Sequence, residues 1–161
     1  MTSEANSNVV LVVDDSPDTL RMLTDALDAA SMTVMVALDG ASAMRIVERI
    51  TPDMILLDAI MPGLDGFETC RRLKRDPRLA DVPVIFMTGL TETEHIVRGL
   101  EAGGVDYVTK PIVVAEMLAR IKVHLTNARL TQSARAAMDV SGRHPFAVDQ
   151  RGVVIWSSPQ A

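Results

Sequence analysis

Short apolar runs alternate with amphipathic segments along the first two thirds of the chain. Several of these runs are apolar throughout, which is typical of parallel strands that are buried on both faces. The expected strands are Val9–Val13, Thr33–Ala37, Met54–Leu57, Val84–Met87 and Val105–Val108. Each is followed by a stretch with helical periodicity, so the pattern repeats a strand–helix unit.

Helix signals fill the segments between the strands. Ser16 is suited to cap a helix that has Pro17 at its first position, and Asp65 is suited to cap the third helix. Apolar stripes at helical spacing mark the helices: Leu20, Leu23, Leu27 and Ala30, then Ala43, Val47 and Ile50, then Phe67, Cys70 and Leu73, then Ile96, Val97 and Leu100. Five strand–helix units in sequence predict an α/β fold, an open parallel sheet with helices on both faces.

The fifth helix is expected to be unusually long. Its pattern runs from Ile112 to about Met138 without an internal proline or glycine, a length of about 40 Å. This helix has two interpretations, a coiled-coil seam or a helix whose first part packs on the sheet. The seam would consist of Val114, Leu118, Ile121, Leu125 and Ala128. We favour packing on the sheet for the first part. As far as Leu125 it packs on the sheet, as the fold requires. Beyond Leu125 a weaker stripe needs a partner, and a second copy of the chain would give a homodimer. The stripe consists of Leu130, Ala134, Ala137 and Met138.

The C-terminal stretch FAVDQRGVVIW predicts two short strands around a turn. A lone hairpin is not stable in water, so we interpret it as the start of a truncated second module. The expected organisation is a disordered lead-in over residues 1–8, a domain over 9–125, a helical linker over 126–143 and the partial module over 144–161.

Composition restricts the classes of protein. The formal net charge is −5, which does not favour nonspecific binding to nucleic acid. The one cysteine, Cys70, excludes an internal disulfide and fits a reducing compartment. No apolar run approaches the roughly 20 residues of a membrane span, and the polar N-terminus lacks a signal-peptide pattern. A cytoplasmic protein without membrane contact is therefore expected.

Carboxylates follow two of the expected strands. Asp14 and Asp15 end the first strand, and Asp58 ends the third. In the common strand order 2-1-3-4-5 these strands are neighbours, and ligands bind at the carboxyl ends beside that point. Three adjacent carboxylates require a proton or a cation. Because all the ligand atoms are oxygens, Mg²⁺, Mn²⁺ or Ca²⁺ is favoured over Zn²⁺.

Two further strand ends supply polar groups to the same edge. Thr88 follows the fourth strand and Lys110 follows the fifth. A cation, a lysine and a hydroxyl around a carboxylate form a site for a phosphoryl group. The carboxylate can itself act as the nucleophile and form an aspartyl phosphate.

The segments VVDDSP, LLDAIMPGLDG, FMTG and GGVDYVTKP occur in this order between Val9 and Leu125. In this set the chain resembles the receiver domains of bacterial two-component response regulators. The resemblance implies a flavodoxin-like fold with sheet order 2-1-3-4-5. It also implies a partner, a sensor histidine kinase or a phosphotransfer protein that donates a phosphoryl group. From about Phe146 the tail resembles the first hairpin of a PAS-like sensor domain.

The resemblance also implies residue roles. Asp58 would be the phosphoacceptor. Mg²⁺, with Mn²⁺ as an alternative, would be held by the carboxylates of Asp14, Asp15 and Asp58 and by the backbone carbonyl of Ile60. Thr88 and Lys110 would bind the phosphoryl oxygens, Tyr107 would be the aromatic switch, and the Lys110–Pro111 peptide bond would be cis.

Three functions compete. The first is a phosphorylation switch, not a turnover enzyme, that controls an output domain outside this chain, expected to be transcriptional. The second is a phosphatase that uses an aspartyl phosphate. It is disfavoured because Ile60 stands two residues after Asp58, where such enzymes commonly place a general acid. The third is a docking module that works without phosphorylation. DNA binding is expected only of a longer parent protein.

Overall fold

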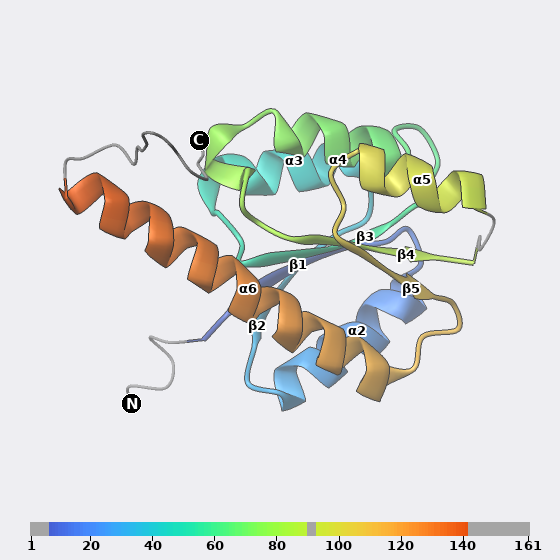
Figure 1. The fold of residues 1–161 in the computed structure, drawn as a ribbon. Coiled ribbons are helices and arrows are strands. Elements are labelled where there is room, and N and C mark those ends of the chain that lie inside the picture. Colours follow the sequence, from blue (N-terminus) through green and yellow to red (C-terminus); the bar gives the residue numbers. More distant parts are fainter. Residues whose placement is uncertain (1–6, 90–92, 142–161) are drawn as a thin grey trace. The chain divides into compact units, whose positions relative to one another are not determined.

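A computed structural model describes residues 7–89 and 93–141. In this part of the chain a five-stranded parallel sheet has the order β2-β1-β3-β4-β5 (Figure 1). Its strands are β1 (Val9–Val13), β2 (Thr33–Ala37), β3 (Met54–Asp58), β4 (Val84–Thr88) and β5 (Asp106–Thr109). Its helices are α2 (Pro17–Ala29), α3 (Gly40–Arg49), α4 (Gly66–Lys74), α5 (Thr93–Glu101) and α6 (Val114–Ser141), with a 3₁₀ turn, η1 (Pro77–Leu79). The predicted fold class and strand order are confirmed.

Four strand boundaries differ by one residue from the sequence prediction, including the end of β5 at Thr109. β3 and β4 continue into the polar residues Asp58 and Thr88, and β5 begins at Asp106. The sheet ladder accounts for this, because Asp58 is paired with Met87, and Thr88 is paired with Thr109. Both polar residues therefore belong to the rigid sheet rather than to the loops that follow it.

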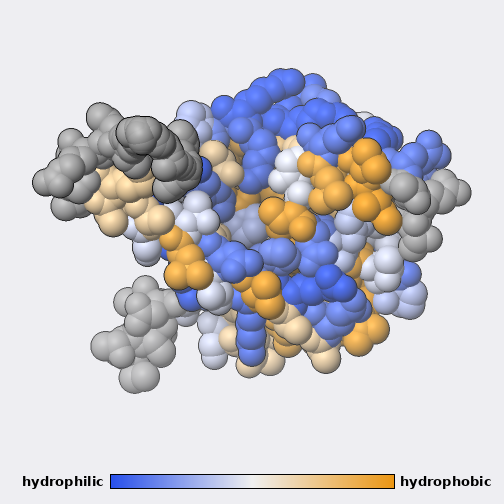
Figure 2. All heavy atoms as spheres, in the orientation of Figure 1, coloured by the Kyte–Doolittle hydropathy of each residue, from blue (hydrophilic) through white to orange (hydrophobic). Residues whose placement is uncertain are grey.

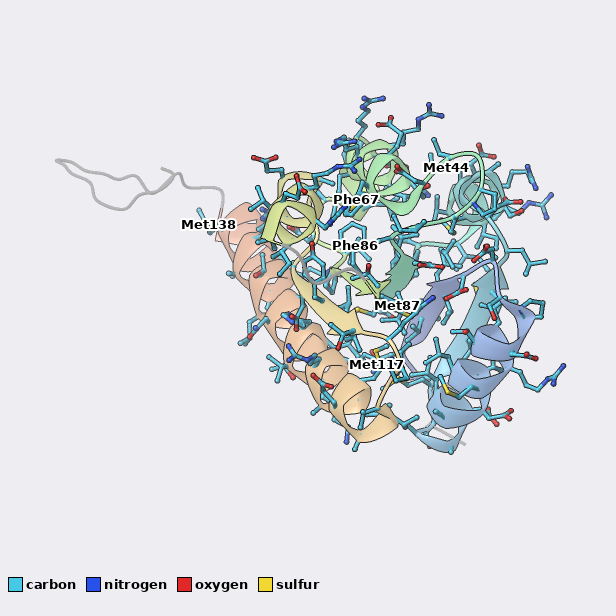
Figure 3. The ribbon with its side chains drawn as sticks, turned by 90° about the vertical axis from the view of Figure 1, so that its right-hand side faces the viewer. Met44, Phe67, Phe86, Met87, Met117 and Met138 are labelled. Carbon is cyan, nitrogen blue, oxygen red and sulfur yellow. The ribbon has the colours of Figure 1, made fainter. Side chains whose placement is uncertain are left out.

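The sheet is covered on both faces, as the continuous apolar strands predicted. Helices α3, α4 and α5 lie on one face, and α2 and the first half of α6 lie on the other (Figure 1). Neighbouring residues of β4 show the consequence. Phe86 packs beside Phe67 of α4, with ring centroids 5.3 Å apart, while Met87 belongs to the opposite cluster with Met117 of α6 (Figure 3).

Side-chain caps fix the helix starts. The Ser16 hydroxyl accepts a hydrogen bond from the Thr19 backbone N–H at 3.3 Å, and Asp65 Oδ1 accepts one from the Glu68 N–H at 2.9 Å. Both caps were predicted. The start of α3 has the same design, because Asp39 is its N-cap and a glycine follows it, as a glycine follows Asp65.

Helix α5 is present where the sequence predicted it, but two of the three residues of its apolar stripe are exposed. Val97 is 43% exposed and Leu100 is 50% exposed, while Gly99 is the buried residue. A side chain at Gly99 would lie only 3.0 Å from the Phe86 ring, so the helix contacts the sheet through this glycine. The apolar side chains are left on the surface over α5 (Figure 2).

Helix α6 has 28 residues, which corresponds to about 42 Å. Its first part packs on the sheet as expected, with Met117, Ile121 and Leu125 buried. The chain divides into two compact units after Thr126, and residues 129–138 of the second unit are all exposed. The predicted C-terminal hairpin lies outside the described residues. None of the described helices combines the length and the apolar composition that crossing a bilayer requires.

Candidate functional site

Three carboxylates meet at the carboxyl ends of β1 and β3. Asp14, Asp15 and Asp58 each offer an oxygen atom, and these atoms all lie within 4.8 Å of one another. Asp14 is fully buried, Asp58 is 5% exposed and Asp15 is exposed to solvent. The structure therefore brings together the aspartates that the sequence placed at this edge of the sheet, and one of them faces water.

Lys110 bridges the two buried carboxylates. Its ammonium group lies 3.1 Å from Asp14 Oδ2 and 3.3 Å from Asp58 Oδ2. Its backbone N–H donates to the Thr88 carbonyl at 2.9 Å, and its peptide bond to Pro111 is cis. The lysine is thus held to the end of β4 by its backbone and to β1 and β3 by its side chain.

The pKa values of Asp58 and Lys110 are shifted by burial and by the neighbouring charges. Burial, together with the charge of Asp14, raises the pKa of Asp58 to about 6, and Lys110 and the Ile60 N–H oppose the rise. Burial by itself lowers the pKa of Lys110, but its hydrogen bonds and ion pairs with Asp14 and Asp58 outweigh burial and the pKa is raised. The Lys110 ammonium therefore offsets only part of the combined effect of burial and of Asp14 on the pKa of Asp58.

The donor set fits a hard divalent cation. The three residues offer carboxylate oxygens and no nitrogen or sulfur, which suits Mg²⁺ better than Zn²⁺. Asp14 is already oriented, because its Oδ1 accepts from the Ser16 N–H at 2.8 Å. Mg²⁺ usually keeps several of its waters, and exposed Asp15 leaves the cluster open on one side to accommodate them.

Two further residues that the sequence predicted for the site, Thr88 and Tyr107, lie on β4 and β5, the strands that follow β3 in the sheet. Thr88 is 2% exposed at the end of β4. The Tyr107 hydroxyl donates to the backbone carbonyl of His95 in α5, and its ring lies 6.0 Å from that of Phe86. Tyr107 therefore connects the last strand of the sheet to the start of a helix on its surface.

The structure also shows a charged cluster that sequence reasoning missed. Asp106 accepts two hydrogen bonds from Arg120 at 2.9 Å and lies 3.0 Å from His124 Nε2. Burial raises the pKa of Asp106, but hydrogen bonds to His124, the Tyr107 N–H and Arg120 hold it below its ordinary value. Arg120 and His124 are 14 and 18 residues away from Asp106 in the sequence, so no local sequence pattern predicts the cluster. It ties β5 to α6.

The chain matches known proteins over most of its length. The family model of the response regulator receiver domain matches residues 10–122. The DNA-binding dual master transcriptional regulator RpaA of Synechocystis sp. is 36% identical over 149 residues, which cover 91% of this chain and 61% of that relative. The response regulator PleD of Caulobacter vibrioides is 40% identical over 134 residues, which cover 83% of this chain and 29% of that relative. The chain thus spans less than two thirds of either relative.

Solved structures agree with the sequence matches. The signal receiver domain of a signal transduction histidine kinase from Syntrophus aciditrophicus has a TM-score of 0.70 at 33% identity, covering 75% of this chain and 92% of that one. The chemotaxis protein CheY4 of Vibrio cholerae has a TM-score of 0.70 at 27% identity, covering 72% and 97%. With its sheet order and its strand-end aspartates, this chain belongs to the response regulator receiver domain family of two-component systems.

Proposed function

We propose that this receiver domain is a phosphorylation switch in which Asp58 accepts a phosphoryl group. The donor is the phosphohistidine of a sensor histidine kinase or a phosphotransfer protein. One observation carries the proposal: Asp58 ends β3 as a buried carboxylate beside Asp14, with the Lys110 ammonium 3.3 Å away. A carboxylate in this setting is a nucleophile next to a cation that can receive phosphoryl oxygens.

The transfer is a displacement at phosphorus. A carboxylate oxygen of Asp58 forms the new P–O bond as the P–N bond to the donor histidine breaks, and the imidazole leaves with the electron pair. We assign Lys110 and Thr88 to the phosphoryl oxygens. We assign a bound Mg²⁺ to the carboxylates of Asp14, Asp15 and Asp58 and to the Ile60 carbonyl, where its charge would offset that of the phosphoryl oxygens.

We infer that Tyr107 transmits the structural effect of phosphorylation from Asp58 to the surface of the domain. The Tyr107 hydroxyl donates to the backbone carbonyl of His95 in the first turn of α5, and Tyr107 lies two residues before Thr109, the partner of Thr88 in the sheet. We expect a movement of Thr88 toward a phosphoryl group to change what Tyr107 can contact. The surface of α5, with exposed Val97 and Leu100, would then differ between the two states. Such a surface is suited to control an output domain.

The output is proposed from the relatives. RpaA is named as DNA-binding, and one relative from Vibrio cholerae is named a probable cyclic di-GMP phosphodiesterase. We favour a transcriptional output that lies outside this chain, with a receiver over residues 9–125, a linker over 126–143 and the start of a second module over 144–161. The residues from 142 onward lie outside the described part of the chain.

Two other functions have less support. A docking module that is never phosphorylated has no need for Lys110 to pair with two buried carboxylates. A phosphatase would need a general acid beside Asp58, and the residue at that position is Ile60, whose side chain cannot donate a proton. We therefore propose a switch that phosphorylates and dephosphorylates itself rather than a turnover enzyme.

Incubation with acetyl phosphate and Mg²⁺ separates the three functions. The switch gives a mass increase of about 80 Da, which borohydride trapping and peptide mapping locate at Asp58. The adduct does not form when EDTA is present. Release of phosphate without accumulation of an adduct identifies a phosphatase, because the switch releases phosphate only as fast as its accumulated adduct decays. The absence of both an adduct and phosphate release identifies a docking module.

The metal assignment gives a prediction for Asp15. In the Asp15→Ala variant we expect Mg²⁺ affinity to fall by at least about tenfold, because fewer anionic oxygens remain to compete with the water shell of the ion. Isothermal titration of the wild type and the variant measures the change. Asp25→Ala is the control, since this aspartate is exposed on α2. Unchanged affinity in Asp15→Ala would show that the metal site is misplaced.

The long helix gives a prediction for self-association. Residues 129–138 of α6 are exposed and include Leu130, at 64%, and Met138, at 44%. We propose that this part of α6 pairs with a second copy of the chain, and we expect removal of the residues after Leu125 to convert a dimer to a monomer. Light scattering coupled to gel filtration measures this. A full chain that is monomeric both with and without phosphorylation would contradict the proposal.

A further inference from the structure

The first turn of α4 lies directly against the backbone of Asp58. Gly66, the first residue of the helix, is buried, and a Cβ atom placed on it would be 2.1 Å from the Asp58 carbonyl oxygen and 2.7 Å from Ala59 Cα. The Gly66 N–H donates to the Ala59 carbonyl at 2.9 Å. Only a residue without a side chain fits between helix and strand here, because the crowded atoms belong to the backbone.

The other side of this strand end is fixed by the sheet. Asp58 is paired with Met87 of β4, and the Ala59 N–H donates to the Met87 carbonyl at 3.0 Å. The end of β3 is thus held between β4 and the first turn of α4. The position of the Asp58 carboxylate relative to Lys110 therefore depends on the helix as well as on the sheet.

We propose that Gly66 is a positioning residue for the phosphoacceptor and that the first turn of α4 acts on the reaction by holding Asp58 in place. The proposal rests on the function proposed above. Transfer between a donor and a carboxylate requires close alignment of the reacting atoms, and a displacement of about 1 Å can lower a rate by about a hundredfold. A methyl group at position 66 must displace either α4 or the backbone of Asp58.

The chain contains a matched control at Gly40. This glycine is also buried, is also the first residue of a helix and also follows an aspartate N-cap. A Cβ atom on Gly40 would lie 2.3 Å from Thr69 Oγ1 and 3.0 Å from a methyl group of Leu64. Gly40→Ala therefore crowds the side chains of Thr69 and Leu64, whereas Gly66→Ala crowds the backbone of the phosphoacceptor.

A second matched pair loosens the same two turns without adding atoms. Asp65 Oδ1 accepts from the Glu68 N–H at 2.9 Å, and Asp39 Oδ1 accepts from the Ser42 N–H at 2.7 Å. Asp65→Ala and Asp39→Ala each remove one cap, from α4 and from α3. This pair decides the question if Gly66→Ala does not fold. Asp65 also lies 3.8 Å from Arg98, so Arg98→Ala is included to separate that contact from the cap.

The experiment measures the rate of phosphorylation by acetyl phosphate over a range of donor concentrations at saturating Mg²⁺, together with the thermal midpoint of each variant. We expect Gly66→Ala to lower the maximal rate by at least about tenfold and Asp65→Ala by at least about threefold. We expect Gly40→Ala and Asp39→Ala to lose thermal stability but to keep the maximal rate within about twofold of the wild type, as should Arg98→Ala.

Equal loss of rate in the two members of each pair would overturn the proposal, since it would reduce the effect to general destabilisation. A folded Gly66→Ala variant with the wild-type rate would also overturn it. Failure of the proposed phosphorylation switch can be distinguished from failure of the Gly66 proposal, because the wild type would then form no adduct at Asp58.

Discussion

Replacing Asp58 by asparagine is expected to abolish phosphorylation and, at the same time, to stabilise the metal-free protein. The pKa of Asp58 is raised from its ordinary value of 3.8 to about 6. A carboxyl group whose pKa is raised on folding favours the folded state when it is protonated and disfavours it when it is ionised. The contribution of Asp58 to the free energy of unfolding is therefore fully present below about pH 4 and is lost as the pH rises through about 6. Asparagine cannot ionise, so it avoids this loss.

The size of the gain follows from the shift. About two pKa units correspond to roughly 3 kcal/mol, and this shift already includes the attraction of Lys110, so we expect a gain of up to roughly 3 kcal/mol at pH 7. Urea unfolding in EDTA at pH 7 and at pH 4.5 measures it, and the gain should largely disappear at the lower pH. Added Mg²⁺ should stabilise the wild type more than the variant.

The matched control is Asp25→Asn. Asp25 is exposed on α2, so its replacement should leave the free energy of unfolding unchanged within about 0.5 kcal/mol. If Asp58→Asn instead destabilises the metal-free protein at pH 7, the attraction of Lys110 exceeds the combined effect of burial and of Asp14. The charge balance described for the site would then be wrong.

The lifetime of the phosphorylated state should be long and should shorten in the double variant Ile60→Asn with Leu90→Glu. Hydrolysis needs a water molecule in line with the bond between Asp58 and phosphorus. Ile60 lies two residues after Asp58 and is 52% exposed, so we expect its apolar side chain to obstruct water without orienting it. The resemblance to receiver domains implies that the residue two positions after Thr88 flanks the same approach. Here that residue is Leu90, which lies outside the described residues.

We expect the double variant to lose its phosphoryl group about tenfold faster, a change of about 1.4 kcal/mol in the barrier. The measurement is the decay of the phosphorylated species after the donor is removed. Ile50→Asn is the control, because Ile50 is 43% exposed just beyond the end of α3. If the wild type decays as fast as the double variant, the approach of water does not limit hydrolysis, and the role assigned to Ile60 and Leu90 is wrong.

The sheet and the meeting of its acidic residues were predictable from the sequence. Continuous apolar runs require a strand with two covered faces, and alternation with helices requires parallel strands. Once the order of strands is set, the carboxyl ends of β1 and β3 are neighbours. Asp14, Asp15 and Asp58 must then share one edge, although Asp15 and Asp58 are far apart in the sequence.

Helix ends were predictable for the same reason, since a cap is a local contact. Ser16 and Asp65 each bond to a backbone N–H three residues further on, within reach of any chain that starts a helix there. The direction in which a helix faces was less predictable. In α5 the apolar residues Val97 and Leu100 are exposed, and the helix instead places Gly99 close to Phe86, where a larger side chain would force the ring to shift.

Only the tertiary structure decided how the site is balanced and held. The pKa of Asp58 depends on how deeply its carboxylate is buried and on its distances to Asp14 and Lys110, which come from three separate segments. The role proposed for Gly66 rests on the close approach of its backbone to that of Asp58. The sequence shows a glycine at this position but does not show which atoms lie against it. Patterns along the chain encode faces and ends of elements, whereas distances between elements arise only when their side chains pack.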